Sequence, residues 1–286
     1  MAFLLVLLAS DSKPVLKYFR ATGISEAAAA VVAGAKPLAG GTVLVPNLAA
    51  NGGRDRTVVD IGRIPELRKT WADDLAIYLG STVSLHSISA DPSIRSNFRA
   101  LAEAADAVGN PQVRRAATIG GNVALDLATT DLVPALVALD GSVVSRDEAK
   151  SQETPISIFA ATNRLITSLK LPNSRQRRSG FRKFAWRRAS GITIVNVAVS
   201  VCIDEGLVSD SRVVAGGFQK KPQRLTAAES ILNGQLIDLD LAAKSAVAAE
   251  QEVSCDLIGP PGEKYRRRLL EYGVKEILAQ LINGDV

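Results

Sequence analysis

The stretch "KPLAGGTVLVPN", from Lys36 to Asn47, places two adjacent glycines and a threonine within an otherwise apolar run. The glycines lie in the apolar segment Pro37–Val45. Taken alone, this pattern is typical of a turn followed by a buried strand. Glycine has no Cβ, so its backbone can also adopt positive φ and approach a ligand closely. Successive N–H groups that point inward form an anion-binding nest. The stretch therefore leaves a structural turn and an anion-binding loop as alternatives.

A second glycine pair follows in "NPQVRRAATIGGN", from Asn110 to Asn122, and it too has a threonine beside it. A hydroxyl or amide next to a glycine pair adds a directional hydrogen bond to whatever the loop holds. Two such loops on separate segments can hold a diphosphate from two sides. The acidic Asp131 comes shortly after the second pair. Together these features favour a ligand that contains phosphate groups.

Composition excludes several kinds of site. The chain has 286 residues, of which 47% are hydrophobic, and this length suffices for two domains. Its two cysteines, Cys202 and Cys255, are far apart and form no CxxC pair. They cannot supply the four ligands that an iron–sulfur cluster or a structural zinc ion usually needs. A disulfide framework is equally disfavoured, so we expect a reducing compartment and a cytoplasmic protein.

Motifs for unaided catalysis are missing from the sequence. The single histidine, His86, has no Ser or Cys nucleophile near it and is interpreted as structural or exposed. No GxGxxG follows a predicted strand, and no GxxxxGK[ST] is present. The apolar run Phe3–Ala9 is shorter than the ~20 residues of a membrane span. It lacks the basic start of a secretory signal, which predicts a buried strand or a short apolar extension. If the chain is an enzyme, a cofactor should carry the reaction.

The net charge of +5 is concentrated in two basic clusters, "NSRQRRSGFRKFAWRR" (Asn173–Arg188) and "YRRR" (Tyr265–Arg268). Basic clusters attract phosphate groups or an acidic partner surface. They are also common on plain solvated faces, and both interpretations stay open here. The sequence changes character within the first cluster, which predicts a domain boundary near Asn173–Gly180.

Hydrophobic periodicity and turn residues predict an α+β protein with mixed sheets. We expect a loop entering a helix at Lys13–Arg20, then a helix capped by Ser25 and ended by Gly34. The remaining expected elements are strands at Arg56–Ile61 and Leu75–Leu85 (turning at Gly80), a helix at Asp91–Gly109, a helix leading into a strand at Thr130–Val144, paired strands at Ile192–Asp204 and Leu207–Phe218, and helices at Ala227–Leu232, Leu239–Gln251 and Tyr265–Leu281.

At this point the sequence resembles a known family. The segments "SEAAAAVVAGAKPLAGGTVLVPN", "RTVVDIGRIPEL", "NPQVRRAATIGGNVAL" and "TDLVPALVALD" are similar to the FAD-binding medium subunit of the molybdenum hydroxylases. That family includes xanthine dehydrogenase and carbon monoxide dehydrogenase. The likeness continues through "FRKFAWRRASGITIVNVAVSV", "VVAGGFQKKPQRLTAAESILNG" and "YRRRLL", and so covers nearly the whole chain in order.

The resemblance implies an FAD-binding domain of the vanillyl-alcohol-oxidase type over residues 1–176, built from two α/β subdomains of about 1–55 and 56–176. A smaller C-terminal α+β domain would span 177–286. It also implies FAD-contacting residues: Pro37, Leu38, Ala39, Gly40, Gly41, Thr42, Val43 and Leu44 in the first loop; Val108; Thr118, Ile119, Gly120, Gly121 and Asn122 in the second loop; and Asp131, Ile166 and Lys183.

Three of these residues have simpler explanations that stay open. Asp131 precedes an apolar helix and could be its N-cap, Lys183 could belong to a solvated basic face, and Ile166 could be ordinary core. The chain also departs from the family at Val43, where many relatives carry a polar residue. The stretch "LDLATTD" lacks a proline that often precedes the aspartate, and Ser190–Gly191 stand where an acidic residue is common. We expect these departures to affect the geometry at the flavin and the identity of the electron acceptor, and to leave FAD binding itself in place.

The resemblance implies a division of labour among subunits. Substrate would be hydroxylated at a molybdenum cofactor on a large subunit, and two [2Fe–2S] clusters on a small subunit would pass electrons to FAD on this chain. FAD, held noncovalently because His86 lies in neither glycine loop, would deliver them to NAD, a quinone or oxygen. The assembly would be a dimer of heterotrimers. A free-standing flavin oxidase or reductase and a non-enzymatic anion or nucleic-acid binder are the alternatives.

Overall fold

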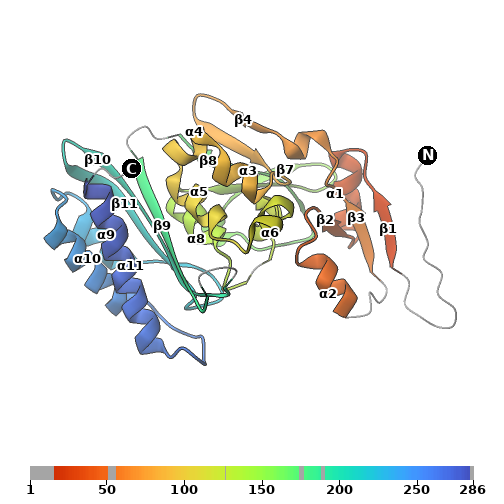
Figure 1. Cartoon of the computed structure of the whole chain (residues 1–286). Coiled ribbons are helices and arrows are strands. Elements are labelled where there is room, and N and C mark those ends of the chain that lie inside the picture. The colour runs from red at the N-terminus through yellow and green to blue at the C-terminus, as the bar shows by residue number, and fades with distance from the viewer. Residues whose placement is uncertain (1–15, 51–55, 126, 174–176, 188–190, 284–286) are drawn as a thin grey trace.

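The chain folds around three β-sheets that follow one another along the sequence (Figure 1). The structure is a computed structural model, and it describes residues 16–50, 56–125, 127–173, 177–187 and 191–283. The apolar run Phe3–Ala9 and the family departure at Ser190 lie outside the described residues. Within those residues, no helix combines the length and the apolar character needed to cross a bilayer.

The first sheet is parallel, with strand order β1-β3-β2. Its central strand has the β-branched sequence "TVVD"; Val58 and Val59 are both buried, and Val59 packs against a helix rich in alanine. Alanine lets a helix lie close to a sheet, since it adds only one methyl group between them. The elements are β1 (Lys17–Arg20), α1 (Ile24–Val32), β2 (Lys36–Leu38), α2 (Leu44–Ala50) and β3 (Thr57–Asp60).

Three local expectations for this region are wrong. Residues Lys17–Arg20 form an edge strand instead of a loop, because they pair in parallel with the strongly predicted strand β3. The N-cap of α1 is Gly23 rather than Ser25, and Glu26 accepts hydrogen bonds from the N–H and hydroxyl of Thr22. The apolar segment Pro37–Val45 is not a buried strand: β2 ends at Leu38, and a largely exposed helix begins at Leu44.

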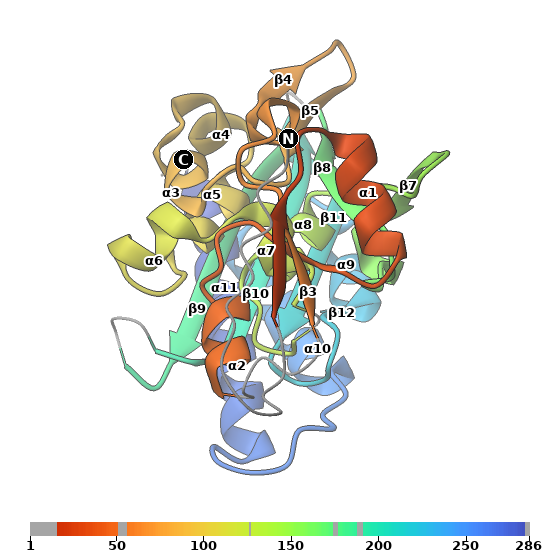
Figure 2. The same cartoon turned by 90° about the vertical axis from the view of Figure 1, so that its right-hand side faces the viewer.

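The second sheet is antiparallel, with order β4-β5-β8-β6-β7, and short helices lie against it (Figure 2). The single helix expected at Asp91–Gly109 is two helices, because Phe98 leaves the helical region with φ −135° and ψ 48° and turns its ring into the core. The elements are η1 (Pro65–Arg68), β4 (Thr70–Ala72), β5 (Ala76–Gly80), α3 (Leu85–Ala90), α4 (Pro92–Asn97), α5 (Arg99–Asp106), α6 (Pro111–Ala116), α7 (Ile119–Val123), α8 (Leu132–Ala138), β6 (Ser142–Arg146), β7 (Ser151–Pro155), η2 (Ile156–Ile158) and β8 (Leu165–Pro172).

The third sheet, ordered β12-β11-β10-β9, is covered on both faces, as its long run of buried residues requires. One face packs on the three C-terminal helices and the other on α5 and α8 (Figure 1). The expected paired strands and all three expected C-terminal helices are confirmed. The elements are β9 (Arg177–Ala185), β10 (Thr193–Asp204), β11 (Leu207–Gly216), β12 (Gln223–Arg224), α9 (Thr226–Leu232), α10 (Leu239–Glu252) and α11 (Glu263–Asn283).

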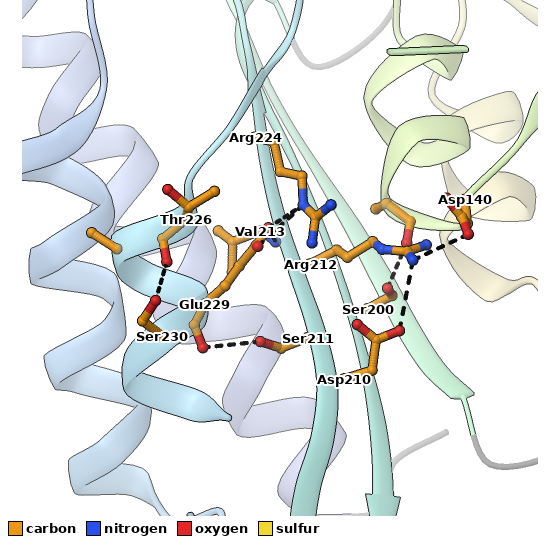
Figure 3. Close-up of polar contacts among 12 residues, drawn as sticks. Asp140, Ser200, Asp210, Ser211, Arg212, Val213, Arg224, Thr226, Glu229 and Ser230 are labelled. Atoms are coloured by element: carbon orange, nitrogen blue, oxygen red, sulfur yellow. Dashed lines mark hydrogen bonds and ion pairs between the residues drawn. The ribbon is translucent and has the colours of Figure 1, made fainter. Parts of the chain in front are cut away.

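A buried carboxylate joins α9 to the third sheet (Figure 3). Glu229 is 4% exposed, and its side chain accepts the N–H of Val213 at 3.0 Å and Nε of Arg224 at 2.8 Å. Its backbone carbonyl accepts the hydroxyl of Ser211 at 3.2 Å. A buried charge is tolerated only when such partners replace water. This cluster therefore fixes how α9 sits on β11.

Replacing Glu229 with alanine should lower the free energy of unfolding by about 1.5–3 kcal/mol, because a buried N–H and a guanidinium lose a charged acceptor. Urea denaturation followed by circular dichroism measures this difference. The control is Glu148→Ala, at an exposed position, which should change stability by less than about 0.5 kcal/mol. Equal stability of the two variants would contradict the assigned role of Glu229.

Candidate functional site

A cleft of about 430 Å³ is lined by residues that follow β2, residues around α7, and residues at the start of β8. Thirteen of the seventeen residues singled out in the sequence line it, although they come from four separate segments. They are Pro37, Ala39, Gly40, Gly41, Thr42, Val43, Leu44, Val108, Thr118, Gly120, Gly121, Asn122 and Ile166. The two glycine loops therefore face one space.

The first glycine loop presents unused backbone donors. Gly41 has φ +69°, a conformation that favours glycine. The N–H groups of Gly40, Gly41 and Thr42 have no acceptor among the described residues, whereas Val45 N–H already donates to the carbonyl of Gly41. Gly40 is needed for a different reason: a Cβ there would lie 1.9 Å from the carbonyl oxygen of Ala116. The loop is thus held tightly against the chain before α7.

The second glycine loop has already used its backbone donors. Thr118 caps α7 by accepting the N–H of Gly121 on its hydroxyl at 3.2 Å, and its carbonyl accepts the N–H of Asn122. The N–H groups of Ile119 and Gly120 donate to the carbonyls of Val83 and Ser81. This loop therefore offers side-chain atoms to the cleft rather than a nest of free N–H groups.

Two polar atoms in the cleft lining have no partner within the described part of the chain. They are the hydroxyl of Ser81, a residue only 2% exposed, and Oδ1 of Asn122. Buried polar groups are nearly always hydrogen-bonded, and an unpaired one costs about 1–3 kcal/mol. Both residues line the cleft, although the two atoms themselves are buried. A polar ligand with donors and acceptors of its own therefore fits this lining.

The basic side chains in the cleft are not equally available. Arg164 is engaged by Asp147 and donates to the carbonyl of Lys150 at 2.8 Å. The pKa of Asp147 is lowered, first by the N–H groups of Lys150 and Ala149 and further by Arg164. Lys36, which also lines the cleft, has no carboxylate partner among the described residues. It is the basic group best able to meet a ligand anion.

Sequence reasoning missed part of this lining. Ser81 sits just after β5, and residues 161–164 lie in the connection before β8. Neither segment carries a glycine pair or a charge pattern that singles it out. Ser81 is brought to the site by Gly120, where a Cβ would lie 2.6 Å from Cβ of Ser81. Only the contact in space reveals it.

Four of the seventeen residues do not line the cleft. Leu38 belongs to β2 and Ile119 is fully buried in the core. Asp131 and Lys183 instead form a buried ion pair, with Nζ and Oδ2 2.6 Å apart. Asp131 stands at the N-cap position of α8, but its side chain does not cap the helix. Lys183 does not belong to a solvated face, since its side chain is only 12% exposed.

The Lys183–Asp131 pair links the third sheet to the cleft wall. Thr193 donates to Oδ1 of Asp131 at 2.7 Å, and Asn196 donates to the same atom at 3.1 Å. Lys183 also donates to the carbonyl of Ala107 at 3.1 Å. The next residue, Val108, lines the cleft. The pair thus holds the cleft wall in place from the side away from the cleft. Separately, Ile166 both lines the cleft and belongs to the hydrophobic core.

A family model for the FAD-binding domain in molybdopterin dehydrogenases matches residues 13–174 of this chain. That match covers more than half of the sequence and includes every segment of the cleft. The chain belongs to this family. A second model, for the C-terminal domain of the CO dehydrogenase flavoprotein, matches residues 180–281. The expected mixed α and β fold, with an FAD-binding domain followed by a C-terminal domain, is confirmed.

Named relatives align in sequence with this chain over most of their length. The medium subunit of nicotine 6-hydroxylase from Paenarthrobacter nicotinovorans is 28% identical over 255 residues, covering 86% of this chain and 89% of the relative. The medium chain of glyceraldehyde dehydrogenase from Sulfolobus acidocaldarius is 23% identical over 273 residues, covering 90% and 95%. These relatives are subunits of oxidoreductases, which is the enzyme class of this family.

Solved structures share the fold. A chain of quinoline 2-oxidoreductase from Pseudomonas putida 86 superposes with a TM-score of 0.86 at 18% identity, covering 96% of this chain and 99% of that one. A chain of carbon monoxide dehydrogenase from Hydrogenophaga pseudoflava gives 0.84 at 23% identity, covering 92% and 95%. At these identities the likeness establishes the fold alone.

Proposed function

We propose that this chain is the FAD-binding electron-transfer subunit of a heteromeric molybdenum hydroxylase, and that the cleft is its FAD site. One observation carries the proposal for the cleft. Both glycine loops line a single space, the N–H groups of the first loop have no acceptor among the described residues, and Ser81 and Asn122 of the same lining carry unpaired polar atoms. FAD has a diphosphate and many polar atoms, so it can satisfy both kinds of group.

The residues would divide the binding between them. The N–H groups of Gly40, Gly41 and Thr42 would donate to the diphosphate, and Lys36 would add a positive charge beside it. Ser81 and Asn122 would bond to polar atoms of the cofactor. Val108 and Ile166 would supply apolar contact and keep water away. Asp131 and Lys183, which the sequence placed among the FAD contacts, would act on the cofactor through the wall that they position.

Bound FAD would supply the electron-transfer chemistry that the side chains themselves lack. The chain's own tasks are to orient the cofactor, to exclude water from its buried part and to set the charge around it. Val43 faces this cleft where a polar residue is common in relatives, so it would make the lining more apolar. His86 is exposed on α3 and does not line the cleft, which supports noncovalent binding.

The relatives suggest the partners. A medium subunit implies a small and a large one, which would carry two [2Fe–2S] clusters and the molybdenum cofactor. Among the described residues, no group of three or more His, Cys, Asp or Glu side chains could hold a metal ion. We propose a dimer of heterotrimers in the cytoplasm. We also propose that the FAD-binding domain covers residues 1–176, with subdomains of about 1–55 and 56–176, and the C-terminal domain residues 177–286.

The basic segment gives little support to a nucleic-acid binder. Arg177, Arg182 and Lys183 each form an ion pair with a carboxylate of this chain. Their charges thus stabilise the third sheet and its contacts rather than forming an open basic surface. A free-standing flavin oxidase remains the second candidate, because its FAD site would look the same.

Purification from the native host, with an affinity tag on this chain, separates the two flavoprotein candidates. The proposal predicts that an iron–sulfur subunit and a large molybdenum subunit co-purify in equal amounts with it. It further predicts that dithionite-reduced iron–sulfur subunit bleaches the flavin absorption of this chain. A flavoprotein that purifies alone and oxidises an organic substrate by itself would contradict the proposed function and favour the free-standing oxidase.

Replacing Ser81 with alanine should weaken FAD binding about tenfold without destabilising the FAD-free protein. The hydroxyl has no partner among the described residues, so its removal should leave the fold unchanged, whereas a hydrogen bond to FAD is lost. Ser245→Ala is the matched control: its hydroxyl donates to the carbonyl of Ala228, so stability should fall while FAD affinity stays the same. Fluorescence titration with FAD and urea denaturation measure both. Unchanged FAD affinity in Ser81→Ala would contradict the assignment.

A further inference from the structure

A second groove adjoins the cleft, and we call it the arginine groove after Arg63, Arg68 and Arg115. Its volume is about 530 Å³, within the range of small-molecule sites. It shares Ala39, Gly40 and Thr118 with the cleft, but its remaining lining is different. No side chain that lines it is a carboxylate.

The three arginines come from separate elements and converge on this groove. Arg63 follows β3, Arg68 ends η1 and Arg115 lies near the end of α6. None of them forms an ion pair or a side-chain hydrogen bond with a described residue. Two carboxylates of the neighbouring segments are paired with other arginines: Asp60 pairs with Arg20 and Asp106 pairs with Arg114.

Another groove of the molecule provides a contrast. It has a volume of about 600 Å³ and is lined by Arg99, Arg182 and Lys183, among other residues. There Arg99 pairs with Glu103, Arg182 with Glu276 and Lys183 with Asp131. Three of its five basic side chains are thus paired within the chain, whereas Arg95 and Arg187 have no carboxylate partner among the described residues. In the arginine groove, none of the three arginines is paired with a described carboxylate.

The rest of the lining favours a small anion over a protein surface. Ser84, Ser87 and Thr70 add hydroxyls, and the hydroxyls of Ser84 and Ser87 lie 2.8 Å apart. The apolar part consists only of Val83 and two alanines. Protein interfaces usually have an aromatic or aliphatic centre, which is missing from this lining. Arginine binds phosphate with two parallel hydrogen bonds, so this residue set suits phosphate groups.

We propose that the arginine groove is a second binding site of this chain and takes a small molecule that bears phosphate groups. Its occupant is distinct from the FAD held in the cleft. Because Gly40 and Thr118 line both spaces, binding in the groove is coupled to the loops that hold FAD. By linkage, each ligand then changes the affinity for the other by the same factor.

Calorimetric titration of the full FAD-loaded chain with inorganic pyrophosphate tests the proposal. Absorbance confirms FAD loading before each titration, so a failure of FAD binding is recognised separately. The proposal predicts one pyrophosphate per chain. The triple variant Arg63→Gln/Arg68→Gln/Arg115→Gln should weaken this binding by at least about tenfold while FAD remains bound. Arg115→Gln alone should weaken pyrophosphate binding by about threefold or more. This single variant replaces the triple variant in the test if the triple variant does not fold.

The matched control removes three positive charges elsewhere. Lys264, Arg268 and Lys275 are exposed on α11, and their replacement by glutamine should change pyrophosphate affinity by less than about twofold. Three results would overturn the proposal: no binding by the wild-type chain, equal loss in the control, or binding only when FAD is absent. The last would make the groove part of the FAD site. Loss of subunit assembly in the triple variant, without pyrophosphate binding by the wild type, would assign the groove to an acidic partner instead.

Discussion

Replacing Gly40 with valine is expected to abolish FAD binding at micromolar concentrations, with a rise in the dissociation constant of at least about 100-fold. A Cβ at this position would lie 1.9 Å from the carbonyl oxygen of Ala116, and 3.1 Å from Cα of Ala117. These are backbone atoms, so no side-chain rotation can make room, and the two loops must separate. Overpacking of this kind typically costs about 1–3 kcal/mol even where neighbours can adjust.

The control for Gly40→Val is Gly262→Val. Gly262 has no positive φ, and a Cβ there meets no atom within 4 Å, so a side chain should be accepted. Fluorescence titration with FAD and thermal denaturation of the FAD-free proteins report binding and folding separately. If Gly40→Val bound FAD as tightly as the control variant, the contact between the loops could not be what shapes the site.

The Lys183→Met variant is expected to lose about 3–5 kcal/mol of stability, because it leaves the buried carboxylate of Asp131 without its cation. Thr193 and Asn196 would still donate to that carboxylate, but neither carries a charge. The variant also loses the hydrogen bond to the carbonyl of Ala107, beside the cleft. Adding Asp131→Asn should recover part of the stability, since an amide needs no cation. Urea denaturation of the wild type, both single variants and the double variant measures the coupling.

This experiment also separates a positioning role of Lys183 from direct contact with FAD. If Lys183 acts by positioning the cleft wall, Lys183→Met loses both stability and FAD affinity. The double variant Lys183→Met/Asp131→Asn then regains part of both. If it contacts the flavin directly, Lys183→Met would keep wild-type stability but shift the flavin reduction potential. The exposed Lys264→Met should change neither quantity. A stable variant with a shifted potential would contradict the wall-positioning account.

Much of the fold could be predicted from the sequence because its strongest patterns are local. Val58 and Val59 in "RTVVDI", and the alternating valines of β10, predict strands without knowledge of their partners. A turn at Gly206, with φ +82°, joins the two long strands that the sequence predicts. The glycine pairs could be recognised as a possible binding clamp for the same reason. Glycine next to threonine in two loops is visible in the sequence itself.

The parts that could not be predicted depend on contacts between distant segments. The sequence does not show that Gly40 lies against Ala116, or that Gly120 lies against Ser81, so the glycines could be explained only by ligand approach or by turns. Likewise, "LKYFR" carries too little pattern to identify an edge strand until β3 is in place. The partner of Lys183 lies on another element, which made a buried ion pair look like part of a basic surface.

The most direct test of the central claim is the visible absorption spectrum of the purified chain after addition of FAD and removal of the excess by gel filtration. We expect flavin absorption equal to one FAD per chain. We also expect acid denaturation to release all of the FAD into the soluble fraction, as for a noncovalently held cofactor. A correctly folded chain that remains colourless after incubation with FAD would contradict the account.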